Sequence, residues 1–190
     1  MIRLSHIDFS YGDTAVLRDF SLTLPEHGVL CLFGASGCGK TTVARLLLGL
    51  EQPRRGTIEG VPSRVAAVFQ EDRLLPWKTV LENVALPLPH EGAAAHAADA
   101  LRRVGLSEET FDRLPRELSG GMRRRVAIAR ALAVPSDFLL LDEPFSGIDE
   151  GNRDRIAADL RQYAATHPVL LITHLPNEAE LLDAAVHHIP

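Results

Sequence analysis

Apolar and polar residues alternate at the beginning of the chain. The alternation runs through residues 2–9 and returns in residues 17–24, and a period of two is typical of strands with one buried face. The apolar positions are Ile2, Leu4, Ile7, Phe9, Leu17, Phe20, Leu22 and Leu24. We therefore expect the chain to begin with two antiparallel strands.

A continuous apolar run then replaces the alternation. It covers Val29–Phe33, and such a run is typical of a strand buried on both faces. A glycine-rich loop follows it and passes into the helical pattern of Val43–Leu50. The sequence thus predicts a strand, a loop and a helix in direct succession.

The character of the chain changes at residues 71–118. Pro76, Pro87 and Pro89 separate short segments, and an alanine-rich stretch after them predicts a helix that ends at Gly105. We interpret this part, up to about residue 118, as a helical subdomain.

Strands and helices alternate again in the last third of the chain. Apolar runs at Phe138–Leu141 and Val169–Ile172 predict buried strands, Asn152–Ala165 predicts a helix, and a last helix and strand follow. The whole pattern indicates an α/β fold with a mixed sheet core, an N-terminal antiparallel part and a helical subdomain.

The composition indicates a globular protein but does not by itself indicate a function. The 190 residues are 46% hydrophobic and 24% charged, as is usual for globular proteins, and the net charge of −5 argues against a dedicated nucleic-acid binder unless a local basic patch overrides it. The beginning of the chain does not resemble a signal peptide, and no run approaches the roughly 20 apolar residues of a membrane span. Any membrane role is therefore expected to depend on a partner protein.

The cysteines do not indicate a disulfide framework or a structural zinc site. Cys31 and Cys38 are the only two, they lie seven residues apart, and no CxxC or Cys/His cluster surrounds them. A reducing cytoplasm fits this usage best.

The glycine-rich loop matches the Walker A pattern for phosphate binding. Loop glycines let successive backbone N–H groups surround phosphate oxygens, and the N-terminus of the following helix adds roughly half a positive charge. Lys40 is expected to reach the β and γ phosphates, the Thr41 hydroxyl to ligate magnesium, and Thr42 to serve the α phosphate. The expected binding residues are Gly34, Ala35, Ser36, Gly37, Cys38, Gly39, Lys40, Thr41 and Thr42. A chance glycine loop is the alternative, and the flanking strand and helix weigh against it.

Two carboxylates follow the apolar run that begins at Phe138. Asp142 and Glu143 stand where a buried strand ends, and ligands of open α/β folds bind at such strand ends. The segment resembles a Walker B motif, in which Asp142 would hold magnesium and Glu143 would polarise the attacking water. Alone, such a pair is usually a turn or a helix cap. Together with the Walker A loop, the catalytic interpretation is favoured.

The string LSGGM, residues 118–122, resembles the signature sequence of ABC ATPases and leads directly into a helical pattern. This resemblance implies the P-loop ABC ATPase fold and ATP and Mg²⁺ as cofactors. It also implies that Ser119, Gly120 and Gly121 bind the γ phosphate of an ATP held by a second subunit. An ordinary Ser/Gly cap before an amphipathic helix is the alternative for the string alone.

Further positions match the ABC family one by one. Tyr11 resembles the residue that stacks on adenine, Gln70 the Q-loop glutamine, Asp149 the D-loop aspartate and His174 the switch histidine. The resemblance implies catalytic roles for Lys40, Gln70, Glu143 and His174, nucleotide contacts for Tyr11 and Asp149, and magnesium ligation by Thr41, Gln70 and Asp142. Each match alone could be structural, and their order along the chain supports the functional interpretation. Departures from the family pattern are Met122, Gly147 and Ile148, and none removes a catalytic group.

The resemblance spans residues 11–174 and divides the single domain 1–190 into parts. Residues 1–70 and 119–190 would form the ATP-binding core, and about 71–118 the helical subdomain. Four other histidines, His90, His96, His187 and His188, show no ligand pattern and receive no function.

The segment from Gln70 to Leu88 looks like the equivalent stretch in ATPases of nitrate, sulfonate and taurine importers. The likeness implies a motor on the cytoplasmic face of the membrane, as a head-to-tail homodimer with permease subunits and a solute-binding protein. Trp77 would then line the docking groove for the permease. Alternatively, Leu74, Leu75 and Trp77 form the core of the subdomain.

Two other classes of function compete with transport. A soluble ABC-type ATPase could act on nucleic acid or ribosomes, but the chain has neither a long coiled-coil insertion nor a second cassette, and we expect no direct nucleic-acid contact. The basic run Arg123–Arg125 is interpreted as a partly solvated face that pairs with local acids. A P-loop kinase would explain the Walker A loop but neither LSGGM nor His174.

Overall fold

The computed structural model describes residues 1–189, which form two compact units. The first unit comprises residues 1–65, 137–142 and the chain from 161 onward, and the second comprises residues 66–136 and 143–160. The chain passes from the first unit into the second within β5 (Val65–Val68). The division into an ATP-binding core and a subdomain of residues 71–118 stays a prediction.

The first unit begins with an antiparallel sheet in the order β2-β1-β4. Its strands are β1 (Ile2–Tyr11), β2 (Thr14–Leu24) and β4 (Arg55–Glu59). The register of β1 on β2 shifts between Leu4 and Ile7, where His6 has φ 53°. This bulge explains why the buried apolar positions of β1 skip from 2 and 4 to 7 and 9.

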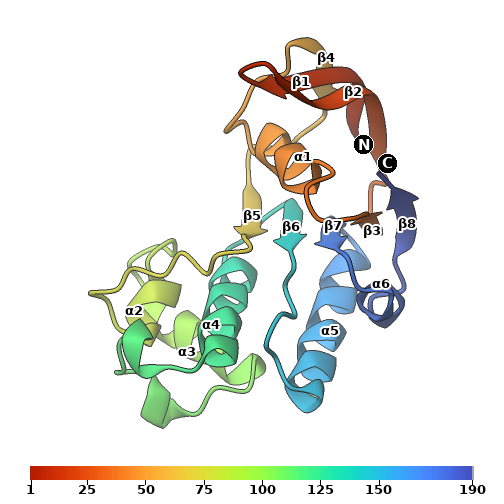
Figure 1. The fold of residues 1–190 in the computed structure, drawn as a ribbon. Helices are drawn as coiled ribbons and strands as arrows, with labels where there is room; N and C mark the ends of the chain where they lie inside the picture. The colour runs from red at the N-terminus through yellow and green to blue at the C-terminus, as the bar shows by residue number, and fades with distance from the viewer. Residues whose placement is uncertain (190) are drawn as a thin grey trace. The chain divides into compact units, whose positions relative to one another are not determined.

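Parallel strands form the buried sheet of the first unit, in the order β6-β7-β3-β8. They are β3 (Gly28–Phe33), β6 (Phe138–Asp142), β7 (Pro168–Thr173) and β8 (Ala185–His188). All five residues of β6 are buried, as the apolar run predicted. Because these strands are parallel, their carboxyl ends meet at one edge (Figure 1).

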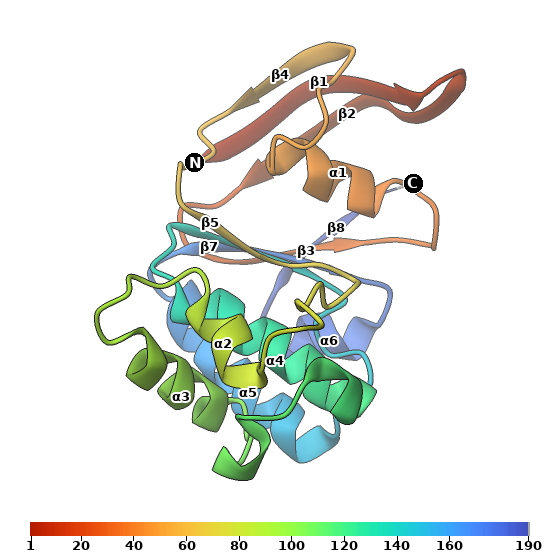
Figure 2. The same ribbon diagram turned by 90° about the vertical axis from the view of Figure 1, so that its left-hand side faces the viewer.

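Helices complete the first unit. In both views α1 (Lys40–Leu47) lies between the antiparallel sheet and the parallel strands, with Val43, Leu46 and Leu47 buried (Figures 1 and 2). A short helix, α6 (Pro176–Leu181), connects β7 to β8. The arrangement fixes the N-terminus of α1 directly after the loop that follows β3.

The second unit is helical. It packs α2 (Val80–Ala85), α3 (Ala93–Arg103) and α4 (Gly120–Ala133) on one another, with short 3₁₀ turns at Glu108–Thr110 and Pro115–Glu117. The first eleven residues of α5 (Glu150–Ala164) also belong to it. Within residues 1–189, no helix combines the length and the apolar character that crossing a membrane requires.

Candidate nucleotide-binding site

The Walker A loop joins the end of β3 to the start of α1. Gly39 is the N-cap of α1 with φ 104°, in the left-handed region that favours glycine. Gly34 is equally constrained, because a Cβ there would collide with the side chains of Cys38 and Ile189. The glycines therefore shape a tight loop, and the free N–H groups of α1 begin directly behind it.

Lys40 places its charge inside this loop. Its side chain is only 7% exposed, and the ammonium donates hydrogen bonds of 2.7 Å to the carbonyls of Gly34 and Ala35. The Sγ atom of Cys38 lies 3.8 Å from the same nitrogen. A buried cation surrounded by loop backbone is well suited to bind phosphate oxygens.

Thr41 and Asp142 meet although they are far apart in sequence. The Thr41 hydroxyl donates to Asp142 Oδ2 over 3.2 Å, and Asp142, at the end of β6, is 3% exposed. Hydroxyl and carboxylate oxygens are ligands that Mg²⁺ prefers, usually one or two of them beside substrate phosphates. The Thr41 hydroxyl and the Asp142 carboxylate therefore fit magnesium that is bound together with a nucleotide.

Two further predicted residues belong to the first unit. His174 follows the end of β7 and is exposed, and β7 pairs with β6 so that Ile172 lies opposite Asp142. His174 is thus at the same sheet edge as the Asp142 carboxylate. Tyr11 ends β1, is 44% exposed, and has its ring edge-on to Phe9 with centroids 4.8 Å apart. One side of the tyrosine ring is packed while much of it stays accessible.

The signature string lies at the start of α4 in the second unit. Ser119 is the N-cap, and its Oγ accepts a hydrogen bond from the Met122 N–H over 3.2 Å. A Cβ on Gly121 would collide with the backbone carbonyl of Gly147. Ser119 therefore caps α4, as the alternative interpretation of the string expected. Gly121 lets the backbone of α4 pack closely against the backbone of Gly147.

Asp149 acts as a local cap at the beginning of α5. Its carboxylate accepts hydrogen bonds from the side chain and the backbone N–H of Asn152, at 2.8 and 3.1 Å. These bonds, with the side-chain bond as the largest cause, lower the pKa of Asp149 below its ordinary value. The side chain is therefore held as an anion at the helix N-terminus.

Gln70 and Glu143 are linked through a residue to which sequence analysis gave no site role. Arg124 is 4% exposed and its guanidinium bonds to backbone carbonyls of both segments. The expectation of a partly solvated basic face is therefore wrong for Arg124, although its pairing with an acid, Asp72, is confirmed at 3.3 Å. Nothing in the sequence reveals this contact, because backbone acceptors carry no residue-specific signal.

Trp77 is exposed on a loop that a second unforeseen residue organises. Asn83 is fully buried; its Oδ1 accepts from the Leu75 N–H, and its Nδ2 donates to the carbonyls of Leu75, Lys78 and Thr79. Trp77 is 71% exposed, so the alternative that placed it in the subdomain core is wrong. The loop thus presents a large aromatic side chain on a fixed backbone.

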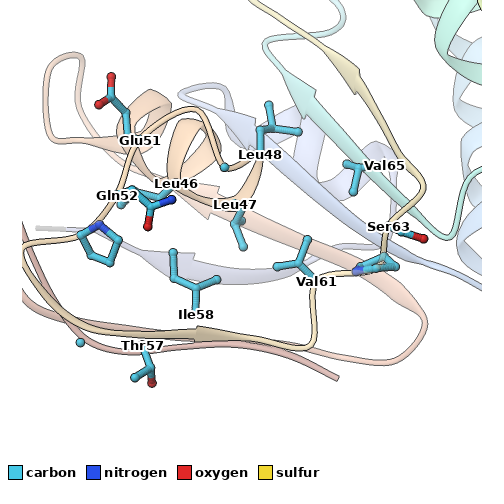
Figure 3. A pocket seen from close by; sticks show the side chains of 14 residues that line it. Leu46, Leu47, Leu48, Glu51, Gln52, Thr57, Ile58, Val61, Ser63 and Val65 are labelled. Atoms are coloured by element: carbon cyan, nitrogen blue, oxygen red, sulfur yellow. The ribbon is translucent and has the colours of Figure 1, made fainter.

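A pocket of about 710 Å³ lies elsewhere in the first unit (Figure 3). Side chains from the last turn of α1 and from the β4 region line it, among them Leu47, Ile58 and Val61. None of the predicted nucleotide-binding residues contributes to it. Its size alone therefore does not make it the site of the chemistry.

Comparisons with known proteins agree with the arrangement of motifs. A family model described as ABC transporter matches residues 17–146. The aliphatic sulfonates import ATP-binding protein SsuB 1 of Pseudomonas syringae pv. syringae is 43% identical over 97% of this chain and 78% of its own length. The SsuB 1 protein of Rhodococcus jostii is 44% identical over 95% of this chain and 75% of its own length.

Solved structures show the same fold. The dimeric ATP-binding cassette MJ0796, in a post-hydrolysis state bound to ADP and Pi, matches with a TM-score of 0.89 and 26% identity. The match covers 100% of this chain and 94% of that one. This agreement confirms the predicted fold class.

Proposed function

Because the chain belongs to the ABC transporter family, we propose that it is the ATP-hydrolysing motor subunit of an importer and that the residues described above carry the reaction. ATP is the substrate, and its hydrolysis drives transport. The observation that carries the proposal is the junction of the two Walker motifs, where the Thr41 hydroxyl meets the Asp142 carboxylate beside a loop that encloses the Lys40 ammonium.

The loop of residues 34–39 and the start of α1 would bind the phosphates of ATP. The backbone N–H groups bind the phosphate oxygens, Lys40 contacts the β and γ phosphates, and Thr42 contacts the α phosphate. Tyr11 stacks on the adenine. Thr41, Gln70 and Asp142 would hold Mg²⁺, which would supply positive charge beside the phosphate oxygens.

Hydrolysis would depend on residues at two strand ends and in the Q-loop. Glu143 accepts a proton from the attacking water, while Gln70 orients that water and His174 contacts the γ phosphate. Proton transfer to a well-placed base is worth about 10²- to 10⁴-fold in rate. These roles depend mainly on the position of the three side chains, because catalysis of phosphoryl transfer consists largely of positioning and charge stabilisation.

Assembly would complete each site. In a two-fold, head-to-tail dimer, Ser119, Gly120 and Gly121 of one subunit bind the γ phosphate held by the other, near Asp149. ATP-driven closure and reopening of the dimer would move permease subunits at the cytoplasmic face of the membrane, and the exposed Trp77 loop is the surface that they would contact.

The solute is proposed from the relatives. Two of them are named as aliphatic sulfonate import proteins, so we assign this chain to an importer of sulfonates or chemically similar organic anions, supplied by a solute-binding protein. A soluble ABC-type ATPase that acts on nucleic acid or ribosomes is not favoured. Purification from native membranes distinguishes the two, because a transporter would bring a multi-span membrane protein with it.

The catalytic proposal is tested with Glu143→Gln. A glutamine preserves the size of the side chain but cannot accept the proton, so turnover should fall by about 10²-fold or more while ATP binding is retained. In the presence of ATP the closed dimer of this variant should then accumulate, and size-exclusion chromatography would detect it as a larger species than the monomer. Glu59→Gln, at an exposed position in β4, is the matched control. Wild-type turnover in the Glu143→Gln protein would refute the assignment.

A further inference from the structure

Arg124 joins two segments of the second unit that are far apart in sequence. Its Nη2 atom donates to the carbonyl of Gln70 over 2.9 Å and to the carbonyl of Glu143 over 3.1 Å. Its Nη1 atom donates to the carbonyl of Phe69 and lies 3.3 Å from a carboxylate oxygen of Asp72. One guanidinium on α4 therefore contacts both the Q-loop backbone and the residue after Walker B Asp142.

Burial makes this contact specific. Arg124 is only 4% exposed, and a buried charge is costly unless it is paired and its hydrogen bonds are made. The Asp72 carboxylate supplies the opposite charge, and three backbone carbonyls accept from the planar fork of N–H donors. A lysine would keep the charge but could not reproduce this geometry.

The backbone of Glu143 shows why its carbonyl needs a fixed partner. Its φ is 48°, a left-handed conformation that residues other than glycine adopt only when surrounding contacts enforce it. Its carbonyl accepts from Arg124 and, at 3.4 Å, from the Ser146 N–H. Because the backbone conformation sets where the side chain starts and which rotamers it can adopt, these bonds fix the point from which the Glu143 side chain leaves the backbone.

We infer that Arg124 is a positioning residue for ATP hydrolysis, which holds the Gln70 and Glu143 backbones in one fixed arrangement against α4. The inference rests on the proposed roles of Gln70 and Glu143. Movement of the Q-loop would thereby be transmitted to the general base through a single side chain. Arg124 touches neither ATP nor water in this role and acts only through its two partners.

Arg130 offers a matched control on the same helix. Its guanidinium donates to the carbonyls of Asp72 and Arg73, each over 2.9 Å, so it also fastens the segment after Gln70. These two carbonyls belong to the segment after Gln70 and not to the segment of Glu143. Substitution of Arg130 should therefore loosen the same segment without disturbing the general base.

The test compares Arg124→Lys with Arg130→Lys in the purified full chain. Arg124→Lys should lower kcat about 10- to 100-fold, because small displacements of catalytic groups have effects of this size, while KM and the Kd for ATP change less than about 3-fold. Arg130→Lys should change kcat by less than about 3-fold. Equal losses in the two variants, or a loss that appears only in KM, would overturn the inference.

Combining the substitutions separates this inference from the proposed function. The part of the effect that passes through Glu143 is absent in the Glu143→Gln protein, so Arg124→Lys should slow that protein clearly less than it slows the wild-type protein. A full additional loss in the double variant would contradict the positioning role. Normal turnover of Glu143→Gln alone would instead refute the catalytic assignment. Thermal unfolding and ATP binding establish that each variant is folded, and Arg124→Gln serves as the second variant if the lysine protein is unstable.

Discussion

At the scale of single residues, Lys40 can be tested against a matched control. The sequence contains only one other lysine, Lys78, and that residue lies outside the Walker A loop. Lys40→Ala removes a buried charge that faces the loop carbonyls, so its charge-assisted bonds to phosphate are lost. Such bonds contribute about 1.5–3 kcal/mol, which corresponds to roughly 10- to 100-fold in Kd.

Titration calorimetry with ATP measures this change in affinity. Lys78→Ala is the control, since Lys78 lies 3.8 Å from Glu82 in a surface ion pair and should leave ATP binding unchanged. An unchanged Kd in the Lys40→Ala protein would mean that the Walker A lysine does not contact the phosphates.

The two cysteines should react differently with thiol reagents. Burial, with a smaller contribution from the Glu178 carboxylate, raises the pKa of the Cys31 thiol to about 11, so it is almost entirely protonated at pH 8. The thiolate is the reactive form, and Cys31 is also fully buried, whereas Cys38 is half-buried in the Walker A loop. Mass spectrometry after labelling of the native protein should find modified Cys38 only, and both cysteines should react in guanidinium chloride.

ATP should slow the labelling of Cys38, because a phosphate in the loop would cover the thiol. Labelling of Cys31 in the native protein at pH 8 would contradict its burial in β3. An unaffected rate at Cys38 in saturating ATP would contradict the proposed position of the phosphates.

Sequence patterns predicted some of these residues and missed others for a physical reason. Lys40 and Thr41 belong to a local motif whose spacing is visible in the sequence, and the buried run before Asp142 indicates a strand end. Arg124 and Asn83 instead make their bonds to backbone carbonyls, which every residue carries. Their roles become visible only when the folded chain shows which carbonyls lie within reach.

At the scale of elements, Asn83 holds the loop that leads into α2. It makes four hydrogen bonds to the backbone of Leu75, Lys78 and Thr79, and it is fully buried. Asn83→Ala removes all four bonds and takes from the Leu75 N–H its side-chain acceptor, which should lower the free energy of unfolding by about 2–3 kcal/mol. Urea denaturation followed by circular dichroism measures the loss.

Two substitutions set the scale for that measurement. Thr79→Ala removes the N-cap side chain of the α2 capping box and should cost about 1 kcal/mol. Asn177→Ala, at an exposed position in α6, should change stability by less than about 0.5 kcal/mol. A loss at Asn83 no larger than at Asn177 would show that the loop is held by other contacts.

The sequence predicted the elements in which burial produces a regular pattern of apolar residues, and it did not predict those without such a pattern. The buried strands β3, β6 and β7 are apolar runs, and β1 and β2 alternate on either side of their bulges. β4 has no such signal, because four of its five residues are exposed and only Ile58 is partly buried. Its place in the sheet depends on backbone pairing with β1, which the side chains do not encode.

At the scale of the whole molecule, the proposed head-to-tail dimer makes a prediction that no single chain can satisfy. Lys40→Ala disables the Walker A loop but keeps the signature, and Ser119→Arg blocks the signature but keeps the Walker A loop. Neither homodimer then contains a working site, because each of its two sites has one disabled half. A mixed dimer contains one site with both halves intact, formed by the Walker A loop of the Ser119→Arg chain and the signature of the Lys40→Ala chain.

Mixing the two inactive proteins should therefore restore ATPase activity. With random pairing, about half of the dimers are mixed and each has one intact site of two, so recovery should reach at most about a quarter of the wild-type rate. A mixture of Lys40→Ala with Thr41→Ala should stay inactive, because both changes lie in the same half of the site. Recovery in that control, or none with Ser119→Arg, would show that the signature does not act on the nucleotide of a second subunit.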